Sequence, residues 1–194
     1  MSAMASYETR TRRFSRAEYD RLIELGVLHE DEPIELLAGR LVVREPQRTP
    51  HAVATQLAAD ALRAAFGAGW SVRVQLPIAL DAESEPEPDV AVVRGAPRDY
   101  LREHPSLPAL VVEVARDSLR SDRMLKARLY ARAGIGDYWI VNLVERVLEI
   151  HRAPVPRRQG RAAVYTDVRR VTAQETVTPL AAPAATIVVA DLLP

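Results

Sequence analysis

The segment 109–142 constrains the fold more than any other part of the chain. An apolar strand at 109–115 is followed by an Arg-rich helix at about 121–133 and by a second apolar strand at 137–142. Two strands joined through a helix pair in parallel, with a right-handed crossover. A strand that is apolar on both sides is normally covered on both faces of its sheet. We therefore expect a buried parallel pair at the centre of the molecule.

One acid interrupts this apolar pattern. Glu113 lies within the first strand, where an unpaired buried carboxylate is costly. Asp89 opens another apolar strand at 90–93, although an acid after Pro88 can also be a simple turn residue. Adjacent strands lie about 4.7–4.9 Å apart, which brings the two carboxylates within reach of one divalent cation. Carboxylates, a backbone carbonyl such as that of Val114, and waters are ligands suited to Mg²⁺.

The remaining patterns place this unit in a mixed α/β fold. The predicted core order is helix, strand, strand, strand, helix, strand, at residues 51–66, 70–80, 89–93, 109–115, 121–133 and 137–142. The first three strands can form a meander, so the sheet is mixed and helices flank it. Further short strands are expected at 146–152, 163–168 and 186–189.

The N-terminal part adds a helix and a hairpin. Ser15 and Glu18 form a capping box that starts a helix ending at Gly26. Two β-type runs at 34–37 and 40–43 surround a glycine turn, and Glu35 between apolar neighbours faces either solvent or a site. Thr49 and Pro50 start the 51–66 helix. His51, in its first turn, is more simply explained as a surface or hydrogen-bonded residue.

Length and composition exclude several classes of protein. With 194 residues we expect one domain, with a flexible arm at 1–13 and a core at about 50–142. The absence of cysteine excludes a disulfide scaffold and a thiolate metal site. We find neither an apolar stretch that spans a bilayer nor a secretory signal, so we expect a cytoplasmic protein that does not contact membranes.

Charge is balanced overall and segregated locally. The net charge is +0, yet residues 81–89 carry an acidic run, and residues 116–132 and 152–161 carry basic runs. Taken alone, each run is most simply a solvated face. Together they suggest an acidic site rimmed by basic surface.

Lys126 is the only lysine among 26 basic residues. A chain that uses arginine for nearly every positive charge keeps lysine where a compact ammonium is needed, or by chance. Asp122 and Lys126 are four residues apart, so a surface salt bridge is the plainer explanation. In a site, Lys126 would orient or activate water, or neutralise charge during phosphodiester hydrolysis at a bound metal.

At these residues the chain resembles the PD-(D/E)xK nuclease superfamily and, more closely, its Uma-two family of restriction-endonuclease-like proteins. The matching features cover most of the chain: 34–41, Pro50 with His51, 74–78, 87–90, 111–114, Asp122 with Lys126 and Tyr130, 133–135 and 138–141. Each is weak by itself, and their order and spacing are specific.

The resemblance implies a restriction-endonuclease-like core with Asp89 and Glu113 as metal ligands and Mg²⁺, or alternatively Mn²⁺, as cofactor. It also implies Lys126 as the catalytic lysine moved onto the helix, Glu35 as a further catalytic acid, and His51 and Gln75 as supporting neighbours. Ala115 stands where the superfamily has its lysine. Arg116 replaces a small polar residue of the family, and Asn142 an aspartate.

Two functions follow from these observations. The first is a Mg²⁺-dependent DNA endonuclease with Arg116, Arg120 and Arg123 near the phosphate backbone, acting as a homodimer because cutting both strands needs two sites. The second is a catalytically silent nucleic-acid-binding or protein-interaction module that keeps the fold. A small-molecule α/β enzyme lacks support, since no Gly-rich phosphate loop or nucleophile motif is found.

Overall fold

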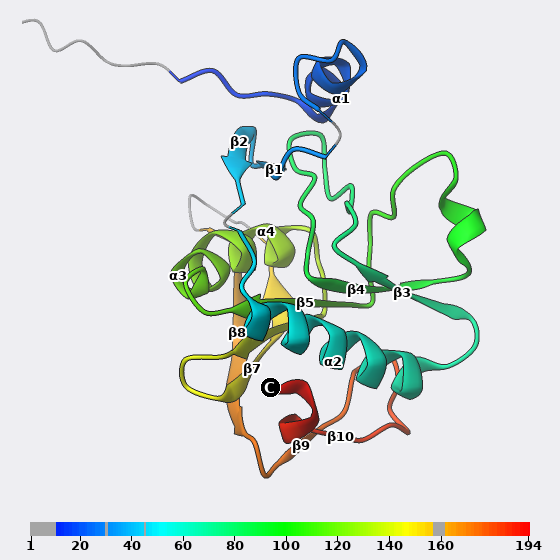
Figure 1. Ribbon diagram of the computed structural model, residues 1–194, viewed down its shortest axis with the longest axis vertical. Coiled ribbons are helices and arrows are strands. Elements are labelled where there is room, and N and C mark those ends of the chain that lie inside the picture. Colours follow the sequence, from blue (N-terminus) through cyan, green and yellow to red (C-terminus); the bar gives the residue numbers. More distant parts are fainter. Residues whose placement is uncertain (1–10, 30, 45, 157–161) are drawn as a thin grey trace, which may run out of the picture.

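The computed structural model describes residues 11–29, 31–44, 46–156 and 162–194. Its centre is a six-stranded sheet of order β3-β4-β5-β6-β7-β8 (Figure 1). The strands are β3 (Trp70–Val74), β4 (Val90–Arg94), β5 (Leu110–Ala115), β6 (Asp137–Asn142), β7 (Val147–Val155) and β8 (Val164–Thr172). Only β5 and β6 pair in parallel, and the other neighbours are antiparallel. The predicted mixed sheet and its parallel central pair are confirmed.

Helices and short strands surround this sheet. They are α1 (Arg16–Glu24), β1 (Ile34–Leu37), β2 (Arg40–Val43), α2 (Thr49–Phe66), η1 (Pro97–Tyr100), α3 (Leu119–Ser121), η2 (Asp122–Lys126), α4 (Ala127–Arg132), β9 (Thr176–Val177), β10 (Ile187–Val188) and η3 (Val189–Leu192). Within the described part of the chain, no helix is long and apolar enough to cross a membrane.

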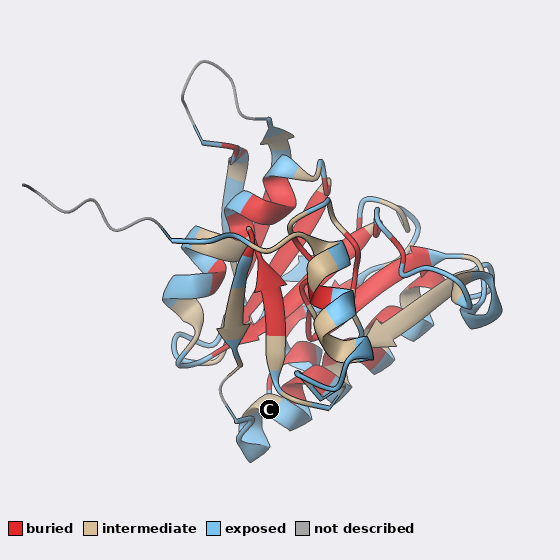
Figure 2. Ribbon diagram, turned by 90° about the horizontal axis from the view of Figure 1, so that it is seen from above, coloured by how far each residue is buried: buried red, intermediate tan, exposed pale blue. Residues whose placement is uncertain are grey.

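Side-chain alternation along the central strands divides the core into two layers. On one face Val112 and Val114 of β5 pack with Trp139, under α2 and η3. On the other face Val111 and Ala115 pack under α4. Figure 2 shows the central strands as the most buried part of the molecule. Because both faces of β5 are covered, the charged side chain of Glu113 is largely shielded from bulk water.

The N-terminal elements form a separate layer against the loop that leads into β4. The capping box of Ser15 and Glu18 is present at the start of α1, as predicted. The antiparallel β1–β2 hairpin is also confirmed. The Glu85 amide donates to the Leu36 carbonyl at 2.7 Å, and the Gly39 amide donates to the Glu83 carbonyl at 2.7 Å. The loop at 81–88 therefore fixes the hairpin above the sheet.

Two local predictions are wrong. The strand expected at 70–80 ends at Val74, because Gln75 takes a positive φ of 52° and its amide turns toward the carbonyls of Pro88 and Asp89. Pro77, which has no N–H for a ladder, follows at once. In α2 the N-cap is Arg48 rather than Thr49, and no side chain caps the helix.

The helix predicted at 121–133 is observed with a different internal geometry. It begins at Leu119, passes through the π-helical segment η2, and continues as α4 to Arg132. Further along, the strand predicted at 163–168 extends to Thr172 as β8. Residues 1–10 of the predicted arm and residues 157–161 of the predicted basic loop lie outside the described residues.

Glu85 gives the stability of this layer a pH dependence. Burial and then the charge of Asp20 raise the pKa of Glu85 to about 7, with Arg16 acting in the opposite direction. A raised folded-state pKa means that the stability contributed by the protonated acid is present below its ordinary value of 4.5 and is lost as the pH rises through about 7.

We therefore expect Glu85→Gln to increase the free energy of unfolding by about 1–2 kcal/mol near pH 8 and by little near pH 5. Urea denaturation at the two pH values measures this difference. Glu83→Gln is the matched control, because Glu83 is a more exposed neighbour paired with Arg13. Equal effects of the two substitutions at both pH values would contradict the assignment.

Candidate active site

A cavity of about 600 Å³ opens where β4 is shorter than its neighbour β5. The hairpin, the start of α2, the entry to β4, the end of β5 and η2 surround it. Its charged and titratable lining consists of Glu35, Arg44, Arg48, His51, Glu87, Asp89, Glu113, Arg116, Asp117, Asp122 and Lys126. Six of these are acids, four are Lys or Arg and one is His, so the lining has mixed charge with a small excess of acids.

Asp89 directly precedes Val90, the first residue of β4, and lies beside the part of β5 that β4 does not pair with. The β4–β5 ladder ends at the pair Val90–Val112, so the Val114 amide has no strand partner on that side. The Asp89 Oδ2 atom accepts this amide at 2.8 Å and lies 3.2 Å from His51 Nε2. Gln75 Nε2 donates to Oδ1 at 3.3 Å. Burial raises the pKa of Asp89, but the His51 hydrogen bond and nearby positive charge outweigh it, so the net pKa is lowered.

Glu113 lies on β5, near Asp89, and is 3% exposed. Its Oε1 atom accepts the Tyr130 hydroxyl at 2.6 Å and pairs with Lys126 Nζ at 3.0 Å. Burial raises the pKa of Glu113 well above its ordinary value, and Lys126 only partly offsets this rise. The carboxylate therefore depends on a neighbouring positive charge to stay ionised.

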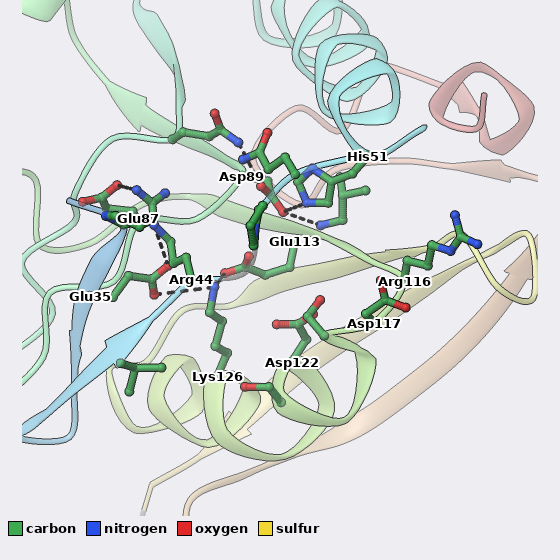
Figure 3. A pocket seen from close by; sticks show the side chains of 18 of the residues that line it. Glu35, Arg44, His51, Glu87, Asp89, Glu113, Arg116, Asp117, Asp122 and Lys126 are labelled. Atoms are coloured by element: carbon green, nitrogen blue, oxygen red, sulfur yellow. Dashed lines mark hydrogen bonds and ion pairs between the residues drawn. The ribbon is translucent and has the colours of Figure 1, made fainter. Parts of the chain in front are cut away.

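Lys126 is the cation at the centre of the cavity. Its Nζ also lies 3.7 Å from Glu35 Oε2, and its side chain is 13% exposed. Figure 3 shows it reaching from η2 toward both acids. Burial lowers the pKa of Lys126, but Glu113, Glu35 and two aspartates together outweigh burial and raise it above its ordinary value. The protonated form of the Lys126 amino group is therefore favoured.

Glu35 extends the site toward the hairpin. Both of its carboxylate oxygens are buried without a hydrogen-bond partner, although Arg44 Nε approaches Oε1 at 3.7 Å. Arg44 also pairs with Glu87 at 2.8 Å. Burial raises the pKa of Glu87, against the effect of Arg44. The hairpin with Arg44 thus adds one acid and a second cation to the charge cluster, and the loop before β4 adds Glu87.

Asp122 corrects one explanation considered for Lys126. The interpretation of Asp122 and Lys126 as a surface salt bridge is wrong, because Asp122 is only 2% exposed and accepts the Ser118 hydroxyl at 2.7 Å. Burial raises the pKa of Asp122 to about 6, with Lys126 opposing the rise. The π-helical geometry of η2 changes the side-chain spacing expected for an α-helix. Such segments often occur at functional sites.

The cavity brings together most of the residues singled out in the sequence. Asp89, Glu113, Lys126, Glu35, His51, Gln75 and Arg116 all line it. Arg120 is exposed on α3 outside this lining. Arg123 also lies outside it and is held by Glu149 at 2.5 Å and Glu145 at 3.2 Å, so it is not a free phosphate ligand.

Sequence reasoning missed Arg44 and Glu87 as members of the site. Arg44 directly follows the predicted hairpin and has no distinctive pattern. Glu87 lies in the family-like segment 87–90, in which only Asp89 was predicted as a site residue. The Tyr130 contact had a signal: Tyr130 follows Lys126 by four residues, one turn along the helix that also carries the lysine.

The donor set fits a divalent cation bound by two carboxylates. Asp89 directly precedes β4, Glu113 lies on the adjacent β5, and both line the same cavity. Hard oxygen ligands suit Mg²⁺ or Mn²⁺. In the described ranges no group of three or more acids, histidines or cysteines is arranged to hold a metal. A two-carboxylate site leaves the other positions to water and phosphate, as is usual for Mg²⁺.

Comparisons with known proteins give a consistent result. The family model Uma2, described as "Putative restriction endonuclease", matches residues 16–186. A crystal structure from Anabaena variabilis, described as a "putative nuclease belonging to DUF820", matches with a TM-score of 0.66 and 16% identity, over 88% of this chain and 96% of that one. This likeness establishes a shared fold. No curated protein matches the sequence significantly.

The Tyr130–Glu113 hydrogen bond makes a testable contribution to stability. Tyr130→Phe keeps the ring and removes the donor to a buried carboxyl group, so we expect a loss of about 1–3 kcal/mol in the free energy of unfolding, measured by urea denaturation. Tyr100→Phe is the control, since its hydroxyl donates to the Arg94 carbonyl near the surface and its loss should cost about 0.5 kcal/mol or less. Equal losses would show that the buried bond has no special role.

Proposed function

Because the chain belongs to the Uma2 family of nuclease-like proteins, we propose that it is a Mg²⁺-dependent endonuclease that hydrolyses phosphodiester bonds of DNA. The family and the fold support a nuclease-like function and a nucleic-acid substrate. The choice of DNA, the metal and the residue roles are our proposal. They rest on the chemistry of the cavity.

One observation carries the proposal: Lys126 Nζ lies 3.0 Å from Glu113 in a cavity that Asp89 also lines. One acid directly before β4, another on the adjacent β5 and an ammonium beside them suit phosphodiester hydrolysis at a bound metal. A structural ion pair would not need a second buried acid, nor an open cavity beside it.

Asp89 and Glu113 would hold the cation. When bound, it would stabilise negative charge on the phosphoryl oxygens and lower the pKa of a coordinated water. Val114, His51 and Gln75 fix the Asp89 carboxylate through the hydrogen bonds described above. Tyr130 fixes one oxygen of Glu113. Both carboxylates are thereby oriented before substrate arrives.

Lys126 acts as a charge rather than as a base in this scheme. The surrounding acids raise its pKa and favour the ammonium form, so we assign it the role of a positive charge and hydrogen-bond donor. It can donate hydrogen bonds that position that water, and it can offset negative charge building on the phosphate. Glu35, 3.7 Å from Nζ, helps to hold the ammonium in place.

Substitutions at the site test catalysis directly. We expect Glu113→Gln and Lys126→Ala each to reduce Mg²⁺-dependent nicking of supercoiled plasmid DNA by at least about 100-fold, because each removes charge stabilisation of the transition state. Arg128→Ala is the control, since Arg128 is an exposed cation on α4 outside the cavity.

The outcome also separates the two candidate functions. Wild-type protein that binds DNA but cuts nothing across Mg²⁺ and Mn²⁺ titrations would support the catalytically silent module instead. Denaturation curves recorded for each variant distinguish lost catalysis from lost folding, since removing one partner of a buried ion pair also destabilises.

Among the three arginines predicted to contact the DNA backbone, Arg116 is the one that lines the cavity. It is exposed in the cavity lining beside Asp117 (Figure 3). Arg123 is instead held by two glutamates. We expect Arg116→Ala to weaken DNA binding several-fold, without sequence preference, and to reduce the salt dependence of the affinity by about one phosphate contact. Fluorescence anisotropy at several salt concentrations measures both quantities, with Arg128→Ala as the reference. An unchanged salt slope would remove Arg116 from the binding surface.

A further inference from the structure

The strand β8 forms a long edge of the central sheet. Within the described residues this nine-residue strand pairs only with β7, through eight residue pairs interrupted at Thr166, and no strand lies on its other side (Figure 1). The opposite edge, β3, has five residues. A strand at an edge offers a row of backbone donors and acceptors to another strand. β8 is therefore the longest surface in this sheet that can accept a partner strand.

The sequence of β8 has only part of the usual protection against such pairing. Edge strands are commonly blunted by proline, charged side chains (lysine above all), bulges or short length, and β8 has the charges of Asp167, Arg169 and Arg170 alone among these. Residues 164–172 contain no proline, glycine or lysine, and five of the nine are valine or threonine, which favour strands. Val164 is 47% exposed and Val168 is 53% exposed. Apolar side chains thus remain uncovered along this edge.

The charges on β8 are arranged so that the strand complements itself. Asp167 and Arg169 lie on one face, two residues apart, with Val168 between them on the other face. If two β8 strands pair antiparallel about Val168, Asp167 of each lies opposite Arg169 of the other, and Val168 lies opposite its own copy. Opposite charges in directly facing positions stabilise an antiparallel pair.

Neighbouring registers lack this complementarity. Moving the centre of pairing by one residue sets Asp167 opposite Asp167, or Arg169 opposite Arg169, and like charges in facing positions are destabilising. Asp167 and Arg169 already pair within one chain at 2.8 Å, and both side chains are at least partly exposed. The register centred on Val168 joins two such pairs into a cluster of alternating charge.

We propose that two copies of this chain dimerise through antiparallel pairing of β8 with β8 about Val168, which continues the central sheet from one copy into the other. The partner is a second copy because the charge pattern matches itself in this register. The proposal concerns a surface formed by β8 and does not depend on the nuclease activity proposed above.

Charge reversal tests both the interface and its register. We expect light scattering to give wild-type protein a mass twice that of the chain. Asp167→Arg and Arg169→Asp should each give the monomer mass, because each places like charges opposite each other. Equimolar mixing of these two variants should restore the dimer mass, since each then supplies the charge that the other lacks. The double variant Asp167→Arg/Arg169→Asp should also dimerise.

Controls separate this interface from loss of folding or from another surface. Asp167 and Arg169 are surface side chains, so the circular dichroism spectra and melting curves of the variants should match the wild type. Asp60→Arg reverses one charge of an exposed ion pair on α2 and should leave the dimer intact. Wild-type protein that stays monomeric at high concentration, single variants that stay dimeric, or a mixture that stays monomeric would each overturn the proposal.

Discussion

The site depends on the balance between buried charges of opposite sign, because the single ammonium of Lys126 lies among several carboxylates. Lys126 lies within 4 Å of Glu113 and Glu35, and the charges of Asp122 and Asp89 also favour its protonated form. Carboxylates buried this deeply repel one another and lose hydration, which is why the pKa of Glu113 is raised. The hairpin, β5 and η2 can close around these acids only because a cation is present among them.

The central fold could be predicted because its signals are local. Strand 109–115, the helix after it and strand 137–142 have clear lengths and periodicity, and the right-handed crossover rule then fixes their pairing. Glu113 and Lys126 stood out for a related reason: one is an acid in an apolar strand, and the other is the only lysine in the chain. A residue that departs from its local pattern can be recognised from its neighbours in the sequence alone.

The rest of the site could not be predicted, because it depends on contacts between distant segments. Residues 70–80 alternate like a strand, yet Gln75 turns away at positive φ and directs its side-chain amide to Asp89. Arg44 lies close to both Glu35 and Glu87, which come from different segments, and no local pattern predicts that these segments are adjacent. The segment is π-helical, and Asp122 bonds to Ser118 instead of forming the surface pair with Lys126 that α-helical spacing predicts. In each case tertiary contacts outweigh local propensity.

The wide spacing of the site residues along the chain also affects when the site can form. Glu35 and Lys126 are separated by most of the first two-thirds of the sequence, and the acids between them come from different elements. No local segment can assemble the cavity, and closing such long loops is slow in folding. During synthesis from the N-terminus, the acids emerge before the lysine that balances them. The growing chain therefore carries no formed site until the helix after β5 has been made and packed.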